Sequence, residues 1–119
     1  MDNLFKIDIS NHIIGRFYFK RTQNGNLIGE FSNNHILRNS TESADLIYSS
    51  DNFVGQYNSN WQENGEAVFA KLYIDFKLGS RDSIYQLKWT HSTGEPMYIG
   101  EGFLFDGVLI GDYRNFEIA

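Results

Sequence analysis

The sequence contains no cysteine and only one proline, Pro96. Without cysteine the chain has no disulfide framework, no thiol nucleophile and no Cys-based zinc site. Proline cannot donate a hydrogen bond to a sheet, so its scarcity fits a chain built mostly of paired strands. Stability must then come from a hydrophobic core, and the 119 residues are enough to bury one in a single domain covering residues 1–119.

Basic residues are few and scattered. The formal net charge is −5, and no cluster of Lys and Arg is longer than Lys20-Arg21. Domains that bind nucleic acids or anionic membranes usually carry a basic stripe. We therefore expect neither a nucleic acid nor a membrane among the partners.

Long apolar runs are also missing. Residues 1–6 lack both a basic start and an uninterrupted apolar stretch, so the sequence predicts neither a signal peptide nor a transmembrane helix. A chain from which a leader had been removed would look the same, so the cytoplasm is the default compartment and secretion stays open.

Signatures of catalysis and of metal binding are lacking as well. His12, His35 and His91 are far apart and form no HxH or HExxH pattern, so we predict no metal site. No Gly-x-Ser-x-Gly elbow, P-loop or dinucleotide-binding fingerprint occurs. We expect no cofactor and no catalytic residue, and binding rather than enzymatic turnover.

The sequence does contain many aromatic residues, 16% of the chain, and apolar residues that alternate with polar ones. Alternation with a period of two is typical of half-buried β-strands, and it predicts roughly nine strands and no helix. The predicted strands are Leu4–Ser10, Ile13–Lys20, Leu27–Ser32, Ala44–Ser49, Phe53–Trp61, Glu66–Lys77, Ser83–His91, Met97–Phe105 and Val108–Phe116.

Short turn sequences separate these strands. Asn24-Gly25 and Asn64-Gly65 predict type I′ hairpins, because Asn and Gly best tolerate the positive φ that both central residues need. Asp106-Gly107 joins the last two strands. The segment Asn33–Ser43 is polar and irregular apart from His35-Ile36-Leu37-Arg38, and we expect it to be the longest loop, with room for a short strand, near the entrance of an interior site.

A repeat relates the two halves of the chain. Gly15 and the pair Asn24-Gly25 align without gaps on Gly55 and Asn64-Gly65, and a Gly-x-aromatic step recurs at Gly111-Asp112-Tyr113. An inward glycine lets a sheet coil sharply. The repeat therefore predicts an all-β, antiparallel meander that closes into an up-and-down barrel of about eight to nine strands, with a β-sandwich as the alternative.

Six aromatic side chains fall on the predicted inner faces. A single buried aromatic is usually part of the core. Together, however, these six carry more hydroxyl and indole N–H groups than a dry core usually holds, because each buried polar group needs a partner. We predict them as ligand-binding residues: Phe17, Tyr57, Trp61, Tyr85, Trp89 and Tyr113.

Glu101 is the one acid that we add to this set. If the strand face that it shares with Met97 and Phe103 points inward, Glu101 is a buried carboxylate and a polar anchor for a ligand. The alternative places Gly100 and Gly102 inside and Glu101 in water. The inward glycines of the other repeats favour this second arrangement.

Several of these motifs resemble a known family. They are Tyr85-x-Leu87-x-Trp89, Gly94, Tyr98-x-Gly100-x-Gly102 and Leu109-x-Gly111-x-Tyr113, preceded by Gly55 to Trp61 and Asn64-Gly65. At this spacing they resemble the strands of small bacterial lipocalin-like, calycin-type barrels. The resemblance implies an antiparallel barrel with an internal ligand site and specifies no ligand. Secreted lipocalins have Gly-x-Trp at the first barrel strand, where this chain has Gly15-Arg16-Phe17.

The favoured function is that of a non-enzymatic barrel that holds a small, largely apolar or aromatic molecule. One alternative is a protein-interaction module, such as an inhibitor, immunity or adaptor protein, which would use an acidic surface and the outward aromatics Phe69, Tyr73 and Tyr18. Another is a barrel-type cyclase or isomerase, which would need a polar pair inside the barrel. The fold by itself does not decide among these classes.

Overall fold

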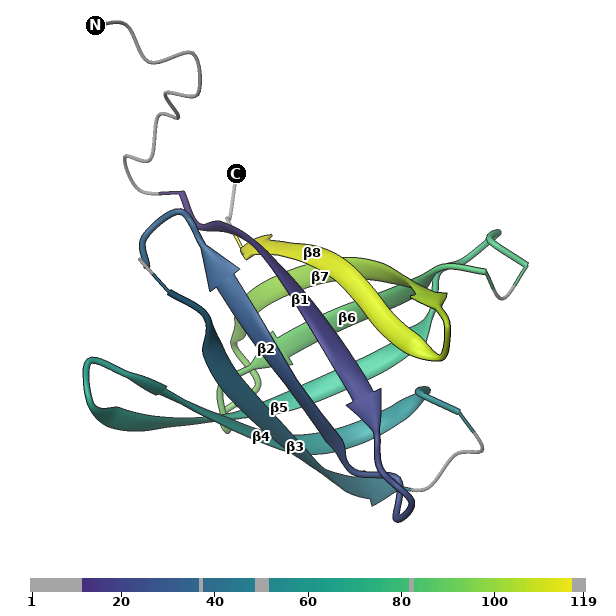
Figure 1. Cartoon of the computed structure of the whole chain (residues 1–119), viewed down its shortest axis with the longest axis horizontal. Helices are drawn as coiled ribbons and strands as arrows, with labels where there is room; N and C mark the ends of the chain where they lie inside the picture. Colours follow the sequence, from purple (N-terminus) through teal and green to yellow (C-terminus); the bar gives the residue numbers. More distant parts are fainter. Residues whose placement is uncertain (1–11, 37, 49–51, 82, 117–119) are drawn as a thin grey trace, which may run out of the picture.

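The computed structural model describes residues 12–36, 38–48, 52–81 and 83–116. Within these ranges, eight antiparallel strands follow one another around a closed barrel (Figure 1). They are β1 (Ile14–Arg21), β2 (Leu27–Asn33), β3 (Ser40–Tyr48), β4 (Gly55–Glu63), β5 (Glu66–Phe76), β6 (Tyr85–Thr90), β7 (Pro96–Phe105) and β8 (Val108–Asn115). The predicted strand Leu4–Ser10 lies outside the described residues.

The barrel closes where the first strand meets the last. β1 pairs with β8 from Ile14↔Arg114 to Phe19↔Leu109. Each described strand therefore has a hydrogen-bonded neighbour on both sides, which removes the free edges of an open sheet. The predicted up-and-down barrel is confirmed and the sandwich alternative is wrong. No helix among the described residues has the length and apolar character needed to cross a membrane.

Side chains alternate between the two faces of the sheet as predicted. Along β5, Ala70, Leu72 and Ile74 are buried, while Phe69 on the opposite face is 73% exposed. All six predicted aromatics are buried on the inner face. The interior of an eight-stranded barrel is just wide enough to be filled by such side chains or to hold one small ligand.

Glycine occupies inner positions where the backbone or a ring of the next strand comes very close. A Cβ atom at Gly111 would lie 2.0 Å from the carbonyl oxygen of Glu101, and one at Gly15 would lie 2.4 Å from the ring of Tyr113. A larger residue would force the neighbouring strand or ring away. These two glycines therefore allow the close approach that a tightly coiled sheet needs.

The two Asn-Gly turns differ from each other. Asn64 and Gly65 both have positive φ, 51° and 82°, and form the predicted type I′ hairpin. At Asn24-Gly25 only the glycine has positive φ, and its N–H donates a 3.0 Å hydrogen bond to the carbonyl of Thr22. The type I′ prediction is wrong at Asn24-Gly25, because a longer turn, residues 22–26, connects the strands and only its glycine is left-handed.

The connection between β2 and β3 is shorter than predicted. The segment Asn33–Ser43 was expected to be a loop, but the chain from Ser40 onward belongs to β3 and pairs with β2 and β4. This part of the loop prediction is wrong, because a polar segment forms a strand when neighbours on both sides satisfy its backbone groups. Asn33 itself ends β2.

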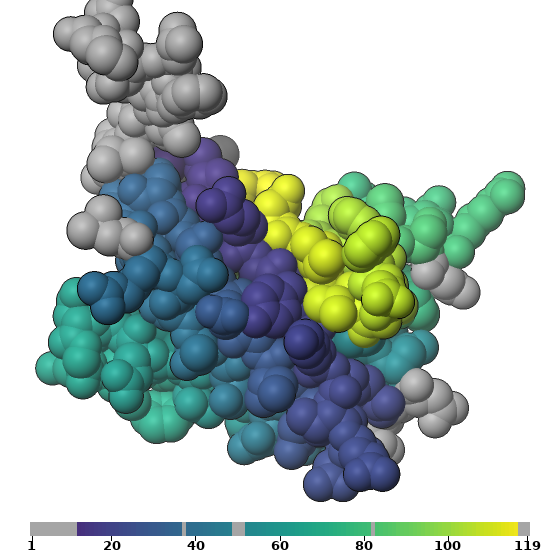
Figure 2. All heavy atoms as spheres, in the orientation of Figure 1, coloured from purple at the N-terminus to yellow at the C-terminus, as the bar shows by residue number. Residues whose placement is uncertain are grey.

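The connections divide between two ends of the barrel. We name one end the open end; it carries the β2–β3 connection, the β4–β5 hairpin and the β6–β7 turn, together with the start of β1 and the end of β8 (Figure 1). We name the opposite end the closed end; it carries the β1–β2, β3–β4, β5–β6 and β7–β8 connections. In the space-filling view, β1, β2 and β8 form adjoining bands across one wall of the barrel (Figure 2).

Candidate functional site

Aromatic side chains pack tightly at the closed end. Phe53, which precedes β4, is 5% exposed, and its carbonyl oxygen accepts a 2.7 Å hydrogen bond from the hydroxyl of Tyr57. The ring of Tyr85 lies 6.1 Å from that of Phe53 and 4.9 Å from that of Phe76, measured between centroids. Tyr57 and Tyr85, two of the predicted ligand-binding residues, are therefore core residues at this end.

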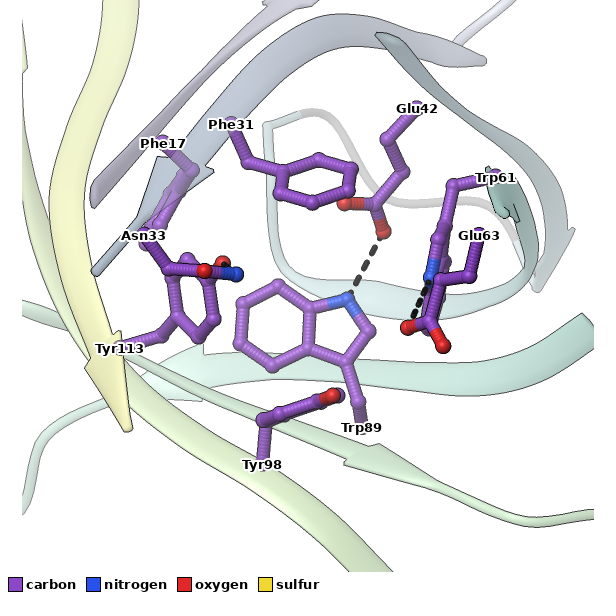
Figure 3. Close-up of a pocket in the computed structure, with 9 residues that line it drawn as sticks. All are labelled: Phe17, Phe31, Asn33, Glu42, Trp61, Glu63, Trp89, Tyr98 and Tyr113. Carbon is purple, nitrogen blue, oxygen red and sulfur yellow. Dashed lines mark hydrogen bonds between the residues drawn. The ribbon is translucent and has the colours of Figure 1, made fainter. Parts of the chain in front are cut away.

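A cavity lies at the open end. It is partly open to solvent, and its volume is about 30 Å³, which is room for about two water-sized groups. This is well below the roughly 300–1,000 Å³ of most small-molecule pockets, so the cavity admits only a small chemical group. Figure 3 shows the side chains that line it: Phe17, Phe31, Asn33, Glu42, Trp61, Glu63, Trp89, Tyr98 and Tyr113.

The aromatic rings of the lining contact one another around the cavity. The ring of Phe31 lies 6.2 Å from that of Trp61 and 6.3 Å from that of Tyr113, both edge to face. Tyr98 lies 5.5 Å from Tyr113, also edge to face, and Trp89 lies 5.9 Å from Tyr113. Such contacts are favourable for aromatic pairs. The wall of the cavity is therefore formed by rings that hold one another in place.

Glu42, on β3, is the buried acid of the cavity. Glu42 is 5% exposed, and its Oε2 accepts hydrogen bonds from Ser59 Oγ at 2.5 Å and from Trp89 Nε1 at 2.8 Å. The second oxygen, Oε1, accepts no hydrogen bond from the described residues. None of the described Lys and Arg side chains lines the cavity or pairs with this carboxylate. Glu42 is thus hydrogen-bonded on one side only and has no counter-ion in this part of the chain.

The surroundings of Glu42 favour its neutral form. Burial raises the pKa of Glu42 to about 7, and the hydrogen bonds from Ser59 and Trp89 lower it by less than burial raises it. A charged carboxylate loses its hydration in such a place, and the described residues provide no positive charge to replace it. Near neutral pH this group therefore exists in both protonation states.

The same surroundings also raise the pKa values of the two tyrosine hydroxyl groups in the cavity lining. Burial raises the pKa of Tyr113 to about 12 against the effect of a hydrogen bond from Asn33, and the charges of Tyr98, Glu42 and Glu63 raise it further. Burial, followed by the charges of Glu63 and Glu42, also raises the pKa of Tyr98. The negative potential of the two carboxylates therefore extends across the cavity to both hydroxyl groups.

Two polar side chains lie where strands end at the rim. Glu63, the last residue of β4, accepts a 3.0 Å hydrogen bond from Trp61 Nε1, and Asn33, the last residue of β2, donates one of 3.0 Å to Tyr113 Oη. Figure 3 shows the two carboxylates near the indole nitrogens, with Asn33 and Tyr113 on the opposite side. The cavity thus has an acidic side and a neutral polar side.

The structure brings four of the predicted ligand-binding residues to this cavity: Phe17, Trp61, Trp89 and Tyr113. Glu101 lies elsewhere, on the outer face of β7, where it forms an ion pair of 2.8 Å with Lys77. Gly100 and Gly102 are the inward residues of that stretch and pair with Leu87 and Tyr85. The structure therefore has the arrangement with Glu101 in water, and this carboxylate does not line the cavity.

Sequence reasoning missed Glu42, because the first half of β3 is polar on both faces and reads as a loop. The signal that could have found it is the period-two series Glu42, Ala44, Leu46, in which the two apolar residues point inward. Asn33 and Glu63 were missed for a different reason. They lie at strand ends, where the alternation of apolar and polar residues stops and no longer indicates which face of the sheet a side chain occupies.

Within the described ranges, no group of three His, Cys, Asp or Glu residues lies close enough to hold a metal ion. Comparison with protein-family models, with curated proteins and with solved structures gives no match. The geometry of the cavity is therefore the basis for a functional assignment.

Proposed function

We propose that the protein binds a small molecule in the open-end cavity without acting on it chemically. One observation carries the proposal: Glu42 is buried among aromatic rings, beside a cavity, with one carboxylate oxygen free of hydrogen bonds. Oε1 is not among the described buried atoms that lack a partner, so it keeps accessible surface and can be reached by a ligand. A ligand that donates a hydrogen bond to Oε1 would gain a charge-assisted bond in a site that is otherwise largely apolar.

The architecture supports the same proposal. The closed barrel of eight antiparallel strands is compatible with the calycin-like fold that the sequence resembles, and barrels of this size either fill with side chains or hold one small ligand. The cavity, at about 30 Å³, accepts only a small group, so the rest of a ligand would lie outside it at the open end. The ligand is therefore a compact molecule with a polar end and an apolar or aromatic body.

Intrinsic fluorescence provides a direct test. The chain has two tryptophans, Trp61 and Trp89, and both line the cavity. Fragment-sized aromatic compounds that are cationic, neutral or anionic are titrated into the protein. We expect at least one of them to change the emission with saturation and to raise the thermal midpoint, because ligand bound to the folded state stabilises it.

Two matched variants locate the binding. Asn33→Phe adds a ring at the rim of the cavity and should abolish the fluorescence response. Ile28→Phe adds a ring to the same strand on its outer face, where Ile28 is 51% exposed, and should leave the response unchanged. The proposal fails if no compound alters either signal, or if the Asn33→Phe variant binds as well as the unmodified protein.

A barrel-type isomerase or cyclase is the second candidate, and Glu42 is the observation that favours it. A carboxyl group with a pKa near 7 suits proton transfer at neutral pH. The other polar side chains of the lining, Asn33 and Glu63, lie at the rim, so binding is the simpler use of the cavity. Mass spectrometry of a compound recovered after incubation distinguishes the two, because only an enzyme returns it chemically changed.

The protein-interaction alternative depends on outward aromatics. Phe69 is largely exposed. Tyr18, however, donates a hydrogen bond to Glu30 on the neighbouring strand, and Tyr73 has the Lys88 ammonium 5.7 Å from its ring centroid. This alternative stays a prediction, and a co-purifying protein combined with an empty ligand screen would favour it.

A further inference from the structure

The charged side chains of the cavity lining are all acidic. Glu42 and Glu63 line it, and no Lys, Arg or His does so. Carboxylates at close range favour a positively charged ligand and oppose an anionic one. The composition of the lining therefore argues against fatty acids and other carboxylates as ligands.

Aromatic rings complement this charge. The rings of Phe31, Trp61, Trp89, Tyr98 and Tyr113 all line the same small space. The face of an aromatic ring carries partial negative charge and attracts a cation within about 6 Å of its centroid. A cage of aromatic rings around a carboxylate is a site that recognises an organic ammonium group by cation–π contact and by charge together.

The size of the cavity limits the cation. Room for about two water-sized groups in about 30 Å³ fits an ammonium nitrogen and its first methylene group. It does not fit a trimethylammonium group without movement of the rings. A primary ammonium has three N–H donors, and Glu42, which lines the cavity, has in Oε1 an acceptor that no described residue uses.

We infer that the open-end cavity selects a small primary organic amine in its ammonium form, with Glu42 as its counter-ion and the aromatic cage around it. This inference rests on the proposed function and names the class of ligand for the same site. Glu63, at the rim beside Trp61, adds attraction as the cation approaches. The body of the amine lies outside the cavity, at its mouth.

Four probes that share a phenyl body test the inference. They are phenethylamine, phenethyl alcohol, phenylpropionate and trimethyl(phenethyl)ammonium. The titrations are followed by tryptophan fluorescence at roughly pH 8, where the amine is charged and most Glu42 is ionised. We expect the amine to bind at least about tenfold more tightly than the alcohol. The trimethylated compound should bind more weakly than the amine, and phenylpropionate should show no binding.

Three variants assign the effect to the carboxylates. Glu42→Gln should weaken the binding of phenethylamine by about 10- to 100-fold and leave that of the alcohol within about twofold. Glu63→Gln, at the exposed rim, should weaken amine binding by about two- to fivefold, and it serves as the test if the Glu42 variant does not fold. Glu101→Gln removes an acid from the outer wall and should change neither affinity.

The outcomes separate the two levels of the claim. If the alcohol or phenylpropionate binds as tightly as the amine, or if Glu42→Gln lowers both affinities equally, the inference is overturned while the proposed function stands. If none of the four probes binds and the wider fluorescence screen is also empty, both are overturned. Preference for the amine that depends on Glu42 supports both.

Discussion

Both ends of the barrel are lined by aromatic side chains, but these side chains are used differently. At the closed end, the hydroxyl of Tyr57 is bonded to the backbone of Phe53, and the ring of Tyr85 packs between Phe53 and Phe76. At the open end, the polar atoms of the aromatics are bonded to other side chains that surround a cavity: Trp89 to Glu42, Trp61 to Glu63, and Tyr113 to Asn33.

The difference shows how one architecture can separate stability from binding. At the closed end, the hydroxyl of Tyr57 is bonded to backbone and the rings around it pack against one another. Where the polar groups are bonded to acids and an amide, space remains and one carboxylate oxygen stays available. Substitutions at the closed end should therefore alter mainly the free energy of unfolding, and substitutions at the open end mainly ligand binding.

The largest effect on the free energy of unfolding is expected when a phenyl ring is removed, and two separate variants compare the two ends. Phe19 is fully buried, and Phe19→Ala should lower the free energy of unfolding by about 3–5 kcal/mol, because it leaves a cavity in packed core. Phe31, half-buried beside existing space, should cost only about 1–2 kcal/mol when changed to Ala. Urea denaturation measures both. Equal losses would show that the two ends are equally well packed.

The next effect is the pH dependence caused by Glu42. Its pKa is about 7 in the folded protein against 4.5 ordinarily, so between these values the folded state keeps a proton that the unfolded chain has released. Stability is full below the lower value and falls as pH rises through this window, by on the order of 3 kcal/mol in total. Comparing urea midpoints across this pH range for the unmodified protein and for Glu42→Gln isolates the contribution.

The Gln variant should lack this fall and be the more stable protein above neutral pH. Its amide is neutral at all these pH values and still offers an oxygen to Ser59 and Trp89. All other charged side chains are the same in the two proteins, so the difference between their pH profiles measures the contribution of Glu42 alone. Parallel pH profiles for the two proteins would contradict the assignment.

A smaller effect is expected from removing one hydroxyl at each end. Tyr57→Phe leaves the buried carbonyl of Phe53 without its donor and should cost about 1–2 kcal/mol. Tyr113→Phe removes an acceptor from Asn33, whose amide is at the rim and can bond to water, so about 0.5 kcal/mol or less is expected. Denaturant titrations of the two variants should rank them in this order.

The smallest effect belongs to the outer wall. The ion pair of Lys77 and Glu101 is solvent-exposed, with 44% of each side chain accessible, and such pairs contribute about 0–1 kcal/mol. Lys77→Ala should therefore change neither the unfolding free energy by more than about 0.5 kcal/mol nor ligand affinity. A marked loss of binding would mean that the outer wall is coupled to the cavity.

The fold was predictable to a large extent, and the site only in part. Alternation along β5 and β6, and the turns at Asn64-Gly65 and Asp106-Gly107, are local signals, so strands and inward faces follow from them. The position of an inward ring along the barrel axis is not local. Tyr57 and Trp61 share a strand and a face, and only the stagger of the neighbouring strands decides which of them borders the cavity.

Glu42 shows the same limit more sharply. The neighbouring Thr41 and Ser43 are polar too, so the segment lacks a period-two contrast and gives no reason to place the acid inside. Its partners come from β4 and β6, which are distant in sequence. A buried carboxylate whose hydrogen bonds are all supplied by other strands becomes visible only once the sheet has closed.

The closing pair of strands also has a consequence for folding kinetics. Gly15 pairs with Tyr113 across almost the whole length of the chain, and contacts of such large sequence separation form slowly because a long loop must first be closed. The cavity lies across this junction, between Phe17 of β1 and Tyr113 of β8. It is therefore completed by the slowest contacts, and a bound ligand should slow unfolding without speeding the early steps of folding.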